Sequence, residues 1–424
     1  MMGVKNKLSW ANLHELHARR KQFIQSAVVL LWIVILVGCN AASKEESGYE
    51  IINTGIKLEG VSGYSWCDNN HIALYWQRDG KEGQSEIIYF EIHNPGRAQY
   101  IDLKVAQTTI SDVHQLTCHN NEIIFVSYPS IVSDPMKRDP AAYVYSVRPG
   151  QAVQLIATMK RGGPYVNGKA KYIVGNNFAF WNEGEIDTQC ATYIRTDYKL
   201  LCWTTWNRMV WPLSKYVLTE YRWEETVQVR GEDGKFKTIK NREKPFFDKQ
   251  DKPISFALIL YDLENRPLIN LSEDEELGIP VQGHSLKAIS PSEEFLYSVC
   301  RRKDYKVGSG GNSVCMFHIN GRKNNWEHLF SLAQEKTEHI GIQNLSVSQA
   351  GEVFFVVPGN KRYRGIWKYT AAANKISQIT NPPAYYDDTF PHVSVDGRWV
   401  AFKRPGQGSS RLFIVQTEVK GEAK

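Results

Sequence analysis

Seven short stretches of this chain repeat one pattern, and this repetition constrains the fold more than any other feature of the sequence. Each stretch consists of a short apolar segment, a tight turn rich in Asp, Asn, Gly, Ser or Glu, and a second segment of β-branched and aromatic residues. Turn residues between two such segments are typical of a β-hairpin. The predicted turns lie near residues 68, 119, 175, 213, 293, 350 and 396.

The hairpins belong to larger units. A variable loop and a third apolar segment, such as residues 412–415, follow each hairpin, and a fourth short segment often comes next, such as residues 376–379. Four-stranded units that repeat at intervals of tens of residues predict a β-propeller. We therefore expect an all-β fold, a β-propeller of seven four-stranded blades, while six or eight blades stay open. The alternative is a pair of β-sandwiches, which also contain regularly spaced short strands.

The two ends of the mature chain complement each other. The last unit has no fourth strand after residues 412–415, because residues 418–424 are a polar tail. Residues 51–56 form an apolar strand that has no hairpin partner of its own. We expect this N-terminal strand to complete the last blade, which closes the ring and removes exposed sheet edges. Residues 50–417 are therefore assigned to the propeller.

The N-terminus has the character of an export signal. Residues 1–22 are polar and basic, and residues 23–37 form an apolar run that is shorter than the ~20 residues of a membrane-spanning helix. The sequence Leu36-Val37-Gly38-Cys39 at its end resembles the lipobox of bacterial lipoproteins. The resemblance implies a signal peptide at residues 1–38, acylation of Cys39 and a lipidated linker at residues 39–49. An uncleaved signal anchor is the alternative.

The resemblance also bears on location and partners. Asn40, rather than Asp, follows the acylated cysteine, and this implies an outer-membrane lipoprotein that faces the periplasm. Loss of residues 1–38 removes five of the 51 Lys and Arg residues and one of the 45 Asp and Glu residues, which leaves a net charge of about +2. Nucleic acid is therefore not expected as a partner, since phosphate binding requires a strongly basic surface.

One turn carries a further family likeness. The segment Ser394-Val395-Asp396-Gly397 and the strand after it resemble the core of the WD40-like repeats found in TolB, and the units at Ser290 and Ser348 resemble it less closely. The TolB-like resemblance implies an envelope location and contact with other proteins rather than a particular reaction. The α/β domain that precedes the propeller in TolB has no counterpart in this sequence.

Six cysteines remain after Cys39, and their positions in the repeat suggest three disulfides. An exported protein meets an oxidising compartment, in which disulfides persist. No CxxC or HxxxH spacing is present, so no metal site and no cofactor are predicted. Six cysteines allow fifteen pairings, and the hairpin pattern favours those across one hairpin or between equivalent positions. The candidate pairs are Cys67 with Cys118, Cys190 with Cys202, and Cys300 with Cys315.

The two faces of the predicted propeller differ. The turns between first and second strands are short and form a plain face, whereas the loops between second and third strands are long, as at residues 127–141 and 223–252. Insertions gathered on one face often mark a binding surface, and this face is called the decorated face. The insert at residues 223–252 contains an Asp-Gly turn and is predicted to form a hairpin arm.

The arm carries aromatic residues that are typical of interface hot spots. We expect these either to anchor a partner or to pack the arm onto its own blade, and both interpretations stay open. The partner-binding candidates are Trp223, Phe236, Phe246 and Phe247.

Other polar residues favour ordinary structural roles. His114, His284 and His392 lie near the starts of innermost strands, where packing is preferred to a metal-binding ring. The acidic run at residues 273–276 is expected to be a solvated loop, and Asp387-Asp388 is expected to cap a turn.

No catalytic motif points to an enzyme. A GxSxG nucleophile elbow and the glycine patterns of nucleotide-binding loops are absent from the sequence. The leading hypothesis is a non-enzymatic envelope module that binds a protein or glycan partner. The alternatives are a hydrolase or lyase that acts on saccharides at the channel mouth, and a structural subunit of a larger envelope complex.

Overall fold

The chain divides into two units, Met1–Glu46 and Ser47–Lys424, and the fold concerns the second. The computed structural model describes residues 49–58, 62–77, 85–105, 108–110, 113–127, 141–160, 165–167, 172–177, 189–194, 199–203, 207–213, 215–222, 225–230, 236–240, 251, 256–262, 266–270, 287–300, 313–319, 326–332, 341–358, 364–383, 385–406 and 409–418. The predicted signal peptide, Cys39 and the linker before residue 49 lie outside these residues. Within the described ranges, no helix has the length and apolar character needed to cross a membrane.

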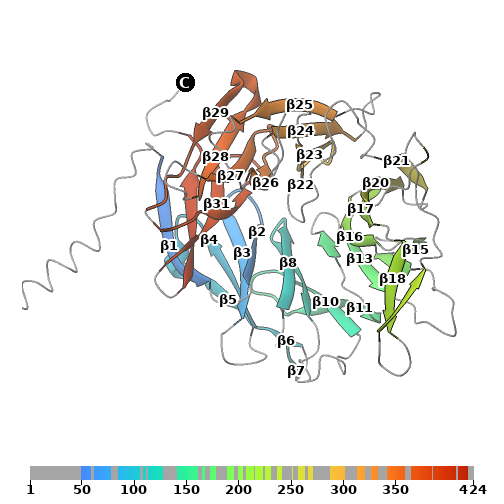
Figure 1. The fold of residues 1–424 in the computed structure, drawn as a ribbon. Coiled ribbons are helices and arrows are strands. Elements are labelled where there is room, and N and C mark those ends of the chain that lie inside the picture. The colour runs from blue at the N-terminus through green and yellow to red at the C-terminus, as the bar shows by residue number, and fades with distance from the viewer. Residues whose placement is uncertain are drawn as a thin grey trace, which may run out of the picture. The chain divides into compact units, whose positions relative to one another are not determined.

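The described strands form seven four-stranded antiparallel sheets (Figure 1). Sheet 1 consists of β2 (Ser62–Trp66), β3 (His71–Gln77), β4 (Ser85–Glu91) and β5 (Gln99–Ile101). Sheet 2 consists of β8 (Val113–His119), β9 (Glu122–Ser127), β10 (Ala141–Val147) and β11 (Gln154–Lys160). Sheet 3 consists of β12 (Tyr165–Asn167), β13 (Tyr172–Asn177), β14 (Gln189–Ile194) and β15 (Lys199–Trp203).

The remaining sheets follow in chain order. Sheet 4 consists of β16 (Asn207–Pro212), β17 (Tyr216–Arg222), β20 (Phe256–Asp262) and β21 (Pro267–Asn270). Sheet 5 consists of β22 (Lys287–Ile289), β23 (Phe295–Cys300), β24 (Ser313–His318) and β25 (Trp326–Ser331). Sheet 6 consists of β26 (Gln343–Val347), β27 (Val353–Pro358), β28 (Arg364–Thr370) and β29 (Lys375–Gln378). Sheet 7 consists of β30 (Thr389–Val393), β31 (Trp399–Pro405), β32 (Ser410–Gln416) and β1 (Ile51–Leu58).

Short elements connect or decorate these sheets. The 3-10 helix η1 (Pro95–Arg97) precedes β5, and η3 (Ala371–Ala373) precedes β29. A two-stranded sheet joins β6 (Lys104–Val105) to β7 (Thr108–Thr109). A second one joins β18 (Thr226–Arg230) to β19 (Phe236–Lys240), between the second and third strands of sheet 4. The hairpin expected in the inserted arm is therefore present.

The interior of sheet 6 is apolar because the sheet is buried on both faces. In β27, Phe354 packs in one cluster with Val400 of sheet 7, while its neighbour Phe355 packs in another cluster with Val299 of sheet 5. Successive side chains of a strand point to opposite faces, so a strand covered on both sides needs a continuous apolar run. Burial on both faces explains why a run of β-branched and aromatic residues follows the predicted turn in this sheet.

Consecutive sheets contact one another along the chain, and sheet 7 contacts sheet 1. The first strands of neighbouring sheets lie side by side, as β2 does with β8 and with β30, and as β26 does with β22 and with β30. The interface of sheets 7 and 1 contains Ile72, Leu74, Ala401 and Leu412, all of them fully buried.

The N-terminal strand is the outer strand of sheet 7. β1 pairs antiparallel with β32, with Ile51 opposite Val415 and Leu58 opposite Ser410. The register shifts between Asn53 and Lys57, so the middle of β1 bulges away from β32. The first described strand is thus held by one of the last, across almost the whole sequence.

A buried serine explains the turn motif that repeats near the C-terminus. The Ser394 Oγ accepts a hydrogen bond from the Trp399 amide at 3.1 Å and donates one to the Asp396 carboxylate at 2.7 Å. Ser290 and Ser348 accept amide hydrogen bonds in the same way, from Phe295 at 3.1 Å and Glu352 at 3.2 Å. A hydroxyl that satisfies buried turn amides makes the tight turn compatible with close packing of the sheets.

One predicted turn is wrong. Gly175 lies inside the continuous strand β13, opposite Thr192 of β14, and the first hairpin of sheet 3 pairs Asn167 with Tyr172 instead. Gly-Asn-Asn has turn composition, but pairing with the neighbouring strand overrides this local preference. The other predicted turns lie between the first and second strands of their sheets.

Two predicted disulfides are confirmed. Cys67, after β2, is bonded to Cys118 of β8, with the Cα atoms 4.6 Å apart, so the bridge ties sheet 1 to sheet 2. Cys300 and Cys315 are bonded across β23 and β24, with the Cα atoms 5.9 Å apart. The backbone places Cys190 directly opposite Cys202 in β14 and β15. The side chains of this third pair lie outside the described part, so its disulfide stays a prediction.

Candidate functional site

Residues 385–392, at the start of sheet 7, present aromatic side chains to solvent and are called the aromatic segment. Tyr385 is 88% exposed and Phe390 is 55% exposed, although most large apolar side chains of the described residues are buried. Aromatic side chains supply much of the binding energy at protein interfaces. An exposed pair within one short segment is therefore a candidate contact surface.

The backbone of the aromatic segment is strained at both exposed aromatics. Tyr385 has φ 73° and Phe390 has φ 53°, in the left-handed region that bulky side chains rarely adopt. Each such residue costs about 1–3 kcal/mol, and such strain gathers at functional sites. The pairing of β30 with β31 is irregular between Thr389 and His392, and a bulge of this kind redirects a side chain.

Two carboxylates tether the aromatic segment to the sheets on either side. The Asp388 carboxylate accepts hydrogen bonds from Nε and Nη2 of Arg404, at 2.6 Å and 2.9 Å. Asp387 accepts a hydrogen bond from the backbone amide of Arg364 at 2.9 Å, and its other oxygen lies 3.6 Å from Nε of Arg364. Arg404 belongs to β31 and Arg364 to β28, so sheets 6 and 7 both hold the segment.

The inner of these contacts is a buried ion pair. The Asp388 side chain is 0% exposed, and the guanidinium of Arg404 lies over the rings of Phe402 and Phe413, at 5.4 Å and 4.9 Å. Burial raises the pKa of the Asp388 carboxyl, and the hydrogen bonds and positive charge of Arg404 oppose that rise. Asp387 and Asp388 were expected to cap a turn. In the structure each of them instead contacts an arginine and ties the aromatic segment to a sheet.

The first strand of sheet 1 supports the aromatic segment from the inner side. The Tyr64 hydroxyl donates to the Phe390 carbonyl, and Nε1 of Trp66 donates to the His392 carbonyl at 2.7 Å. The Tyr64 ring meets the His392 ring edge-on, with the centroids 5.3 Å apart. His392 is exposed to solvent, although the protein atoms packed around its ring partly desolvate it and lower its pKa.

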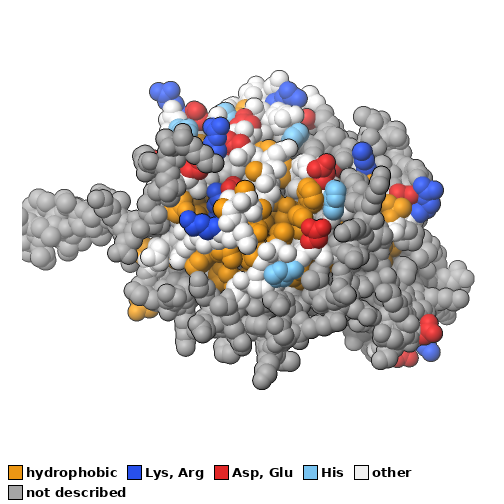
Figure 2. Space-filling view, turned by 90° about the horizontal axis from the view of Figure 1, so that it is seen from above, with side chains coloured by type: hydrophobic (Ala, Val, Ile, Leu, Met, Phe, Trp, Pro, Cys, Tyr) orange, Lys and Arg blue, Asp and Glu red, His pale blue; other side chains and the backbone are white. Residues whose placement is uncertain are grey.

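The aromatic segment lies on the decorated face. Thr389 is opposite Lys403, near the end of β31, so the segment lies beside the connection from β31 to β32. That connection joins the second and third strands of sheet 7, whereas the tight turn at Asp396 lies at the other end of the strands. Figure 2 shows one face of the molecule, on which apolar side chains gather with histidine and charged side chains around them.

The side chains predicted from the sequence to bind a partner lie outside the described part of the structure. Trp223, Phe246 and Phe247, the acidic run at residues 273–276 and His284 lie outside the described residues. Phe236 begins β19 and His114 lies in β8, but their side chains are outside the described part. These assignments stay predictions. In the part of the chain that the structure describes, no three His, Cys, Asp or Glu side chains lie close enough to hold a metal ion.

Tyr385 and Phe390 were not predicted from the sequence as contact residues. A run of two prolines and two tyrosines directly before Asp387 was the available signal, since Pro favours extended connections and paired tyrosines are typical of contact surfaces. The residue types in this run do not reveal that the two side chains are exposed or that their backbone is in the left-handed region.

Comparison with known proteins concerns the fold. No protein-family model matches the chain, and no curated protein matches it. Among solved structures, an oligogalacturonate lyase from Vibrio parahaemolyticus shares 10% identity at a TM-score of 0.56, over 89% of this chain and 95% of that one. The β-propeller domain of the Trilobed protease from Pyrococcus furiosus shares 9% identity at a TM-score of 0.49, over 89% of this chain and 97% of that one.

A third solved structure is TolB from Acinetobacter baumannii. It shares 10% identity at a TM-score of 0.37, over 81% of this chain and 79% of that one. The described residues form an all-β fold built mainly from four-stranded antiparallel sheets. Its structural neighbours include TolB and the β-propeller domain named above.

Proposed function

We propose that this protein is a lipid-anchored β-propeller of the bacterial cell envelope that binds a protein or glycan partner through its decorated face. In this proposal, cleavage before Cys39 leaves an acylated N-terminus in the outer membrane, and the body faces the periplasm. The seven four-stranded sheets act as seven blades, and β1 closes the ring by completing sheet 7.

The exposed and tethered aromatic segment carries the binding proposal. Tyr385 and Phe390 are 88% and 55% exposed, while the Asp388–Arg404 pair holds the segment on sheet 7 and the Asp387–Arg364 contact holds it on sheet 6. A contact surface that is already ordered loses little conformational entropy when a partner binds. Strained backbone gathers at functional sites and exposed aromatics supply binding energy at interfaces, so both features serve a preformed contact.

The test is capture of the partner from crosslinked cell envelopes by the full-length protein. The double variant Tyr385→Ala/Phe390→Ala should reduce recovery of an enriched protein or glycan at least about tenfold, equal to about 1.4 kcal/mol. The matched control is Leu155→Ala/Leu268→Ala, which removes apolar side chains of 48% and 46% exposure from the outer strands β11 and β21. Equal recovery with both double variants would overturn the assignment of the surface.

A variant that lacks residues 223–252 shows whether the aromatic segment or the arm is the contact surface. If deletion of residues 223–252 abolishes capture while the aromatic double variant retains it, the arm is the contact surface. If that partner also co-purifies in a fixed ratio without crosslinking, the third hypothesis, a structural subunit of a larger envelope complex, is favoured instead. Urea unfolding midpoints of all variants must match, so that loss of capture reports binding.

The second candidate function is a saccharide-active lyase or hydrolase. Its support is the fold shared with an oligogalacturonate lyase, at 10% identity. This support is at the level of the fold, because one fold hosts many functions. Incubation of the purified full-length protein with oligogalacturonate should produce no unsaturated uronate absorbance if the binding proposal is correct. Turnover of that substrate would replace the binding module with the enzyme.

A further inference from the structure

The three outer strands of sheet 7 carry three cations side by side, next to the connection from β31 to β32 on the decorated face. Arg404 of β31 is directly opposite Arg411 of β32, and Arg411 is directly opposite Lys57 of β1. Residues that oppose one another project from the same side of an antiparallel sheet, with Cβ atoms about 4.5–5.5 Å apart. These three residues are called the cation row. Like charges in opposed positions destabilise a sheet, so the row has a cost for the folded protein.

One cation of the row is neutralised within the fold. The Asp388 carboxylate accepts hydrogen bonds from Arg404 at 2.6 Å and 2.9 Å, and both side chains are buried. Lys57 and Arg411 are exposed, and no carboxylate of the described residues forms an ion pair with either of them. The two outer positions of the row therefore present two adjacent positive charges to solvent.

The bulge in β1 brings Lys57 opposite Arg411. Asn53 is opposite Phe413 and Lys57 is opposite Arg411, so five residues of β1 span the length of three residues of β32. In a regular register Lys57 would instead be opposite Ser409, which precedes the first residue of β32. Bulges redirect side chains and are frequent next to functional sites.

Hydrogen bonds hold the bulge in one conformation. The Gly55 amide donates to Oδ1 of Asn53 at 3.0 Å, and the Ile56 amide donates to Oγ1 of Thr54 at 3.2 Å. Oγ1 of Thr54 in turn donates to the Leu412 carbonyl at 2.7 Å, which fixes the bulge to β32. The alignment of the two exposed cations is therefore built into this pair of strands.

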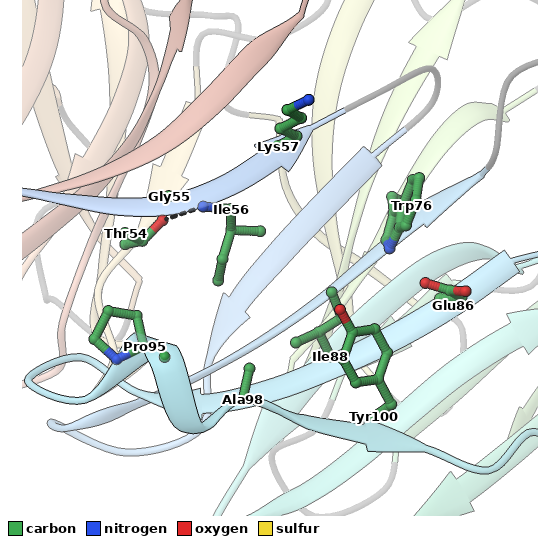
Figure 3. Close-up of a pocket in the computed structure, with 11 residues that line it drawn as sticks. Thr54, Gly55, Ile56, Lys57, Trp76, Glu86, Ile88, Pro95, Ala98 and Tyr100 are labelled. Atoms are coloured by element: carbon green, nitrogen blue, oxygen red, sulfur yellow. Dashed lines mark hydrogen bonds between the residues drawn. The ribbon is translucent and has the colours of Figure 1, made fainter. Parts of the chain in front are cut away.

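Lys57 is also one of the residues that line an open cavity of about 590 Å³ between β1 and sheet 1 (Figure 3). Figure 3 shows the Lys57 side chain on the side of β1 opposite to Ile56. Successive side chains of a strand point to opposite faces, and Ile56 packs in one cluster with Leu412, the neighbour of Arg411. The Lys57 ammonium therefore lies on the same side of sheet 7 as Arg411.

We propose that Lys57 and Arg411 form a binding site for a phosphomonoester group. At neutral pH this group carries about 1.5–2 negative charges and three acceptor oxygens, which matches two adjacent cations. A guanidinium donates two parallel N–H groups to phosphate oxygens, and an ammonium donates to a further oxygen. A single carboxylate carries one negative charge and neutralises only one of the two cations. The site does not include Tyr385 or Phe390 and does not depend on the partner surface proposed above.

The experiment is calorimetric titration of the full-length protein, in maltoside micelles and a phosphate-free buffer. The phosphate-bearing probes are inorganic phosphate, glucose 6-phosphate and phosphatidic acid mixed into the micelles. Glucose, succinate and phosphatidylcholine, a phosphodiester, are the comparison probes. At least one phosphate-bearing probe should bind saturably, and it should bind more tightly than every comparison probe.

Lys57→Gln/Arg411→Gln should weaken binding of that probe at least about tenfold. The matched control is Lys375→Gln/Arg398→Gln, which removes one exposed lysine and one exposed arginine from the plain-face ends of sheets 6 and 7. The control should bind as tightly as the unchanged protein. The probe should also raise the thermal unfolding midpoint of the unchanged protein and of the control, but not that of Lys57→Gln/Arg411→Gln.

The probes also identify the source of the phosphomonoester. Tighter binding of glucose 6-phosphate than of inorganic phosphate assigns the site to a phosphorylated sugar, and binding of phosphatidic acid alone assigns it to a lipid headgroup. The proposal is overturned if no phosphate-bearing probe binds saturably, or if Lys57→Gln/Arg411→Gln binds as tightly as the control variant. Tighter binding of succinate than of every phosphate-bearing probe also overturns it, because the site would then be specific for carboxylates.

Discussion

Replacement of Asp388 by alanine should destabilise the fold far more than the same replacement of its neighbour Asp387. The Asp388 and Arg404 side chains are 0% and 10% exposed and share hydrogen bonds of 2.6 Å and 2.9 Å. Removal of one partner leaves the buried guanidinium without its counter-charge, which costs about 3–5 kcal/mol. Asp387 and Arg364 are 35% and 32% exposed with 3.6 Å between the charged atoms, a contact worth about 0–1 kcal/mol.

The assay is equilibrium unfolding in urea, with the midpoint and slope compared across the variants. The double variant Asp388→Leu/Arg404→Met should recover part of the stability lost in Asp388→Ala, because it removes both charges rather than one. Equal destabilisation by the two single alanine variants would refute the reasoning. So would a double variant that is no more stable than Asp388→Ala, since the cost would then come from lost volume and not from an uncompensated charge.

Three further predictions follow from the turns and the disulfide. Gly397→Ala should lower the unfolding free energy by about 1–2 kcal/mol, and by more than Gly150→Ala does. Both glycines have φ 79°, but only at Gly397 would an added Cβ meet a neighbouring turn, at 3.1 Å from Ser348. Urea unfolding measures both variants. Loss of the Cys67–Cys118 bridge, which spans 51 residues, should cost about 4 kcal/mol under the same assay, and a cost near zero would contradict the chain-entropy argument. Desolvation favours a raised pKa at Asp68, but hydrogen bonds from two backbone amides and one imidazole outweigh it and lower the pKa in the folded protein. The ionised carboxylate therefore stabilises the fold above pH 3.8, and this stabilisation is lost as the pH falls through the lower pKa of the folded protein. Asp68→Asn should therefore flatten the acid limb of the stability curve measured by thermal unfolding.

Much of the fold could be predicted because each sheet repeats the same local chemistry. In the unit at Ser394, a buried hydroxyl, an Asp and a Gly in the left-handed region form one tight turn, and the apolar run after it fills both faces of its sheet. Turn chemistry and strand burial act over a few residues, so the pattern is visible in the sequence. Cys67 and Cys118 could be paired because they occupy equivalent places in adjacent units.

The turn predicted at Gly175 is absent because long-range strand pairing, rather than local turn chemistry, decides the structure there. Its Gly-Asn-Asn sequence satisfies the local rule for a turn, but the strand continues because its partners in β14 are available across the sheet. Long-range pairing competes with local preference, and only the register of the neighbouring strand decides between them.

The sequence by itself determined the all-β repeat, the main hairpin turns, the two observed disulfides and the hairpin within residues 223–252. These features depend on residue types close together in the chain or at equivalent places in a repeat. The tertiary structure alone decided the exposure and strained backbone of Tyr385 and Phe390, the burial of Asp388 against Arg404, and the cavity between β1 and sheet 1. Each of these joins residues from different sheets. Burial, strain and enclosed volume arise only when distant strands pack together, and no local pattern encodes which side chains then remain in contact with solvent.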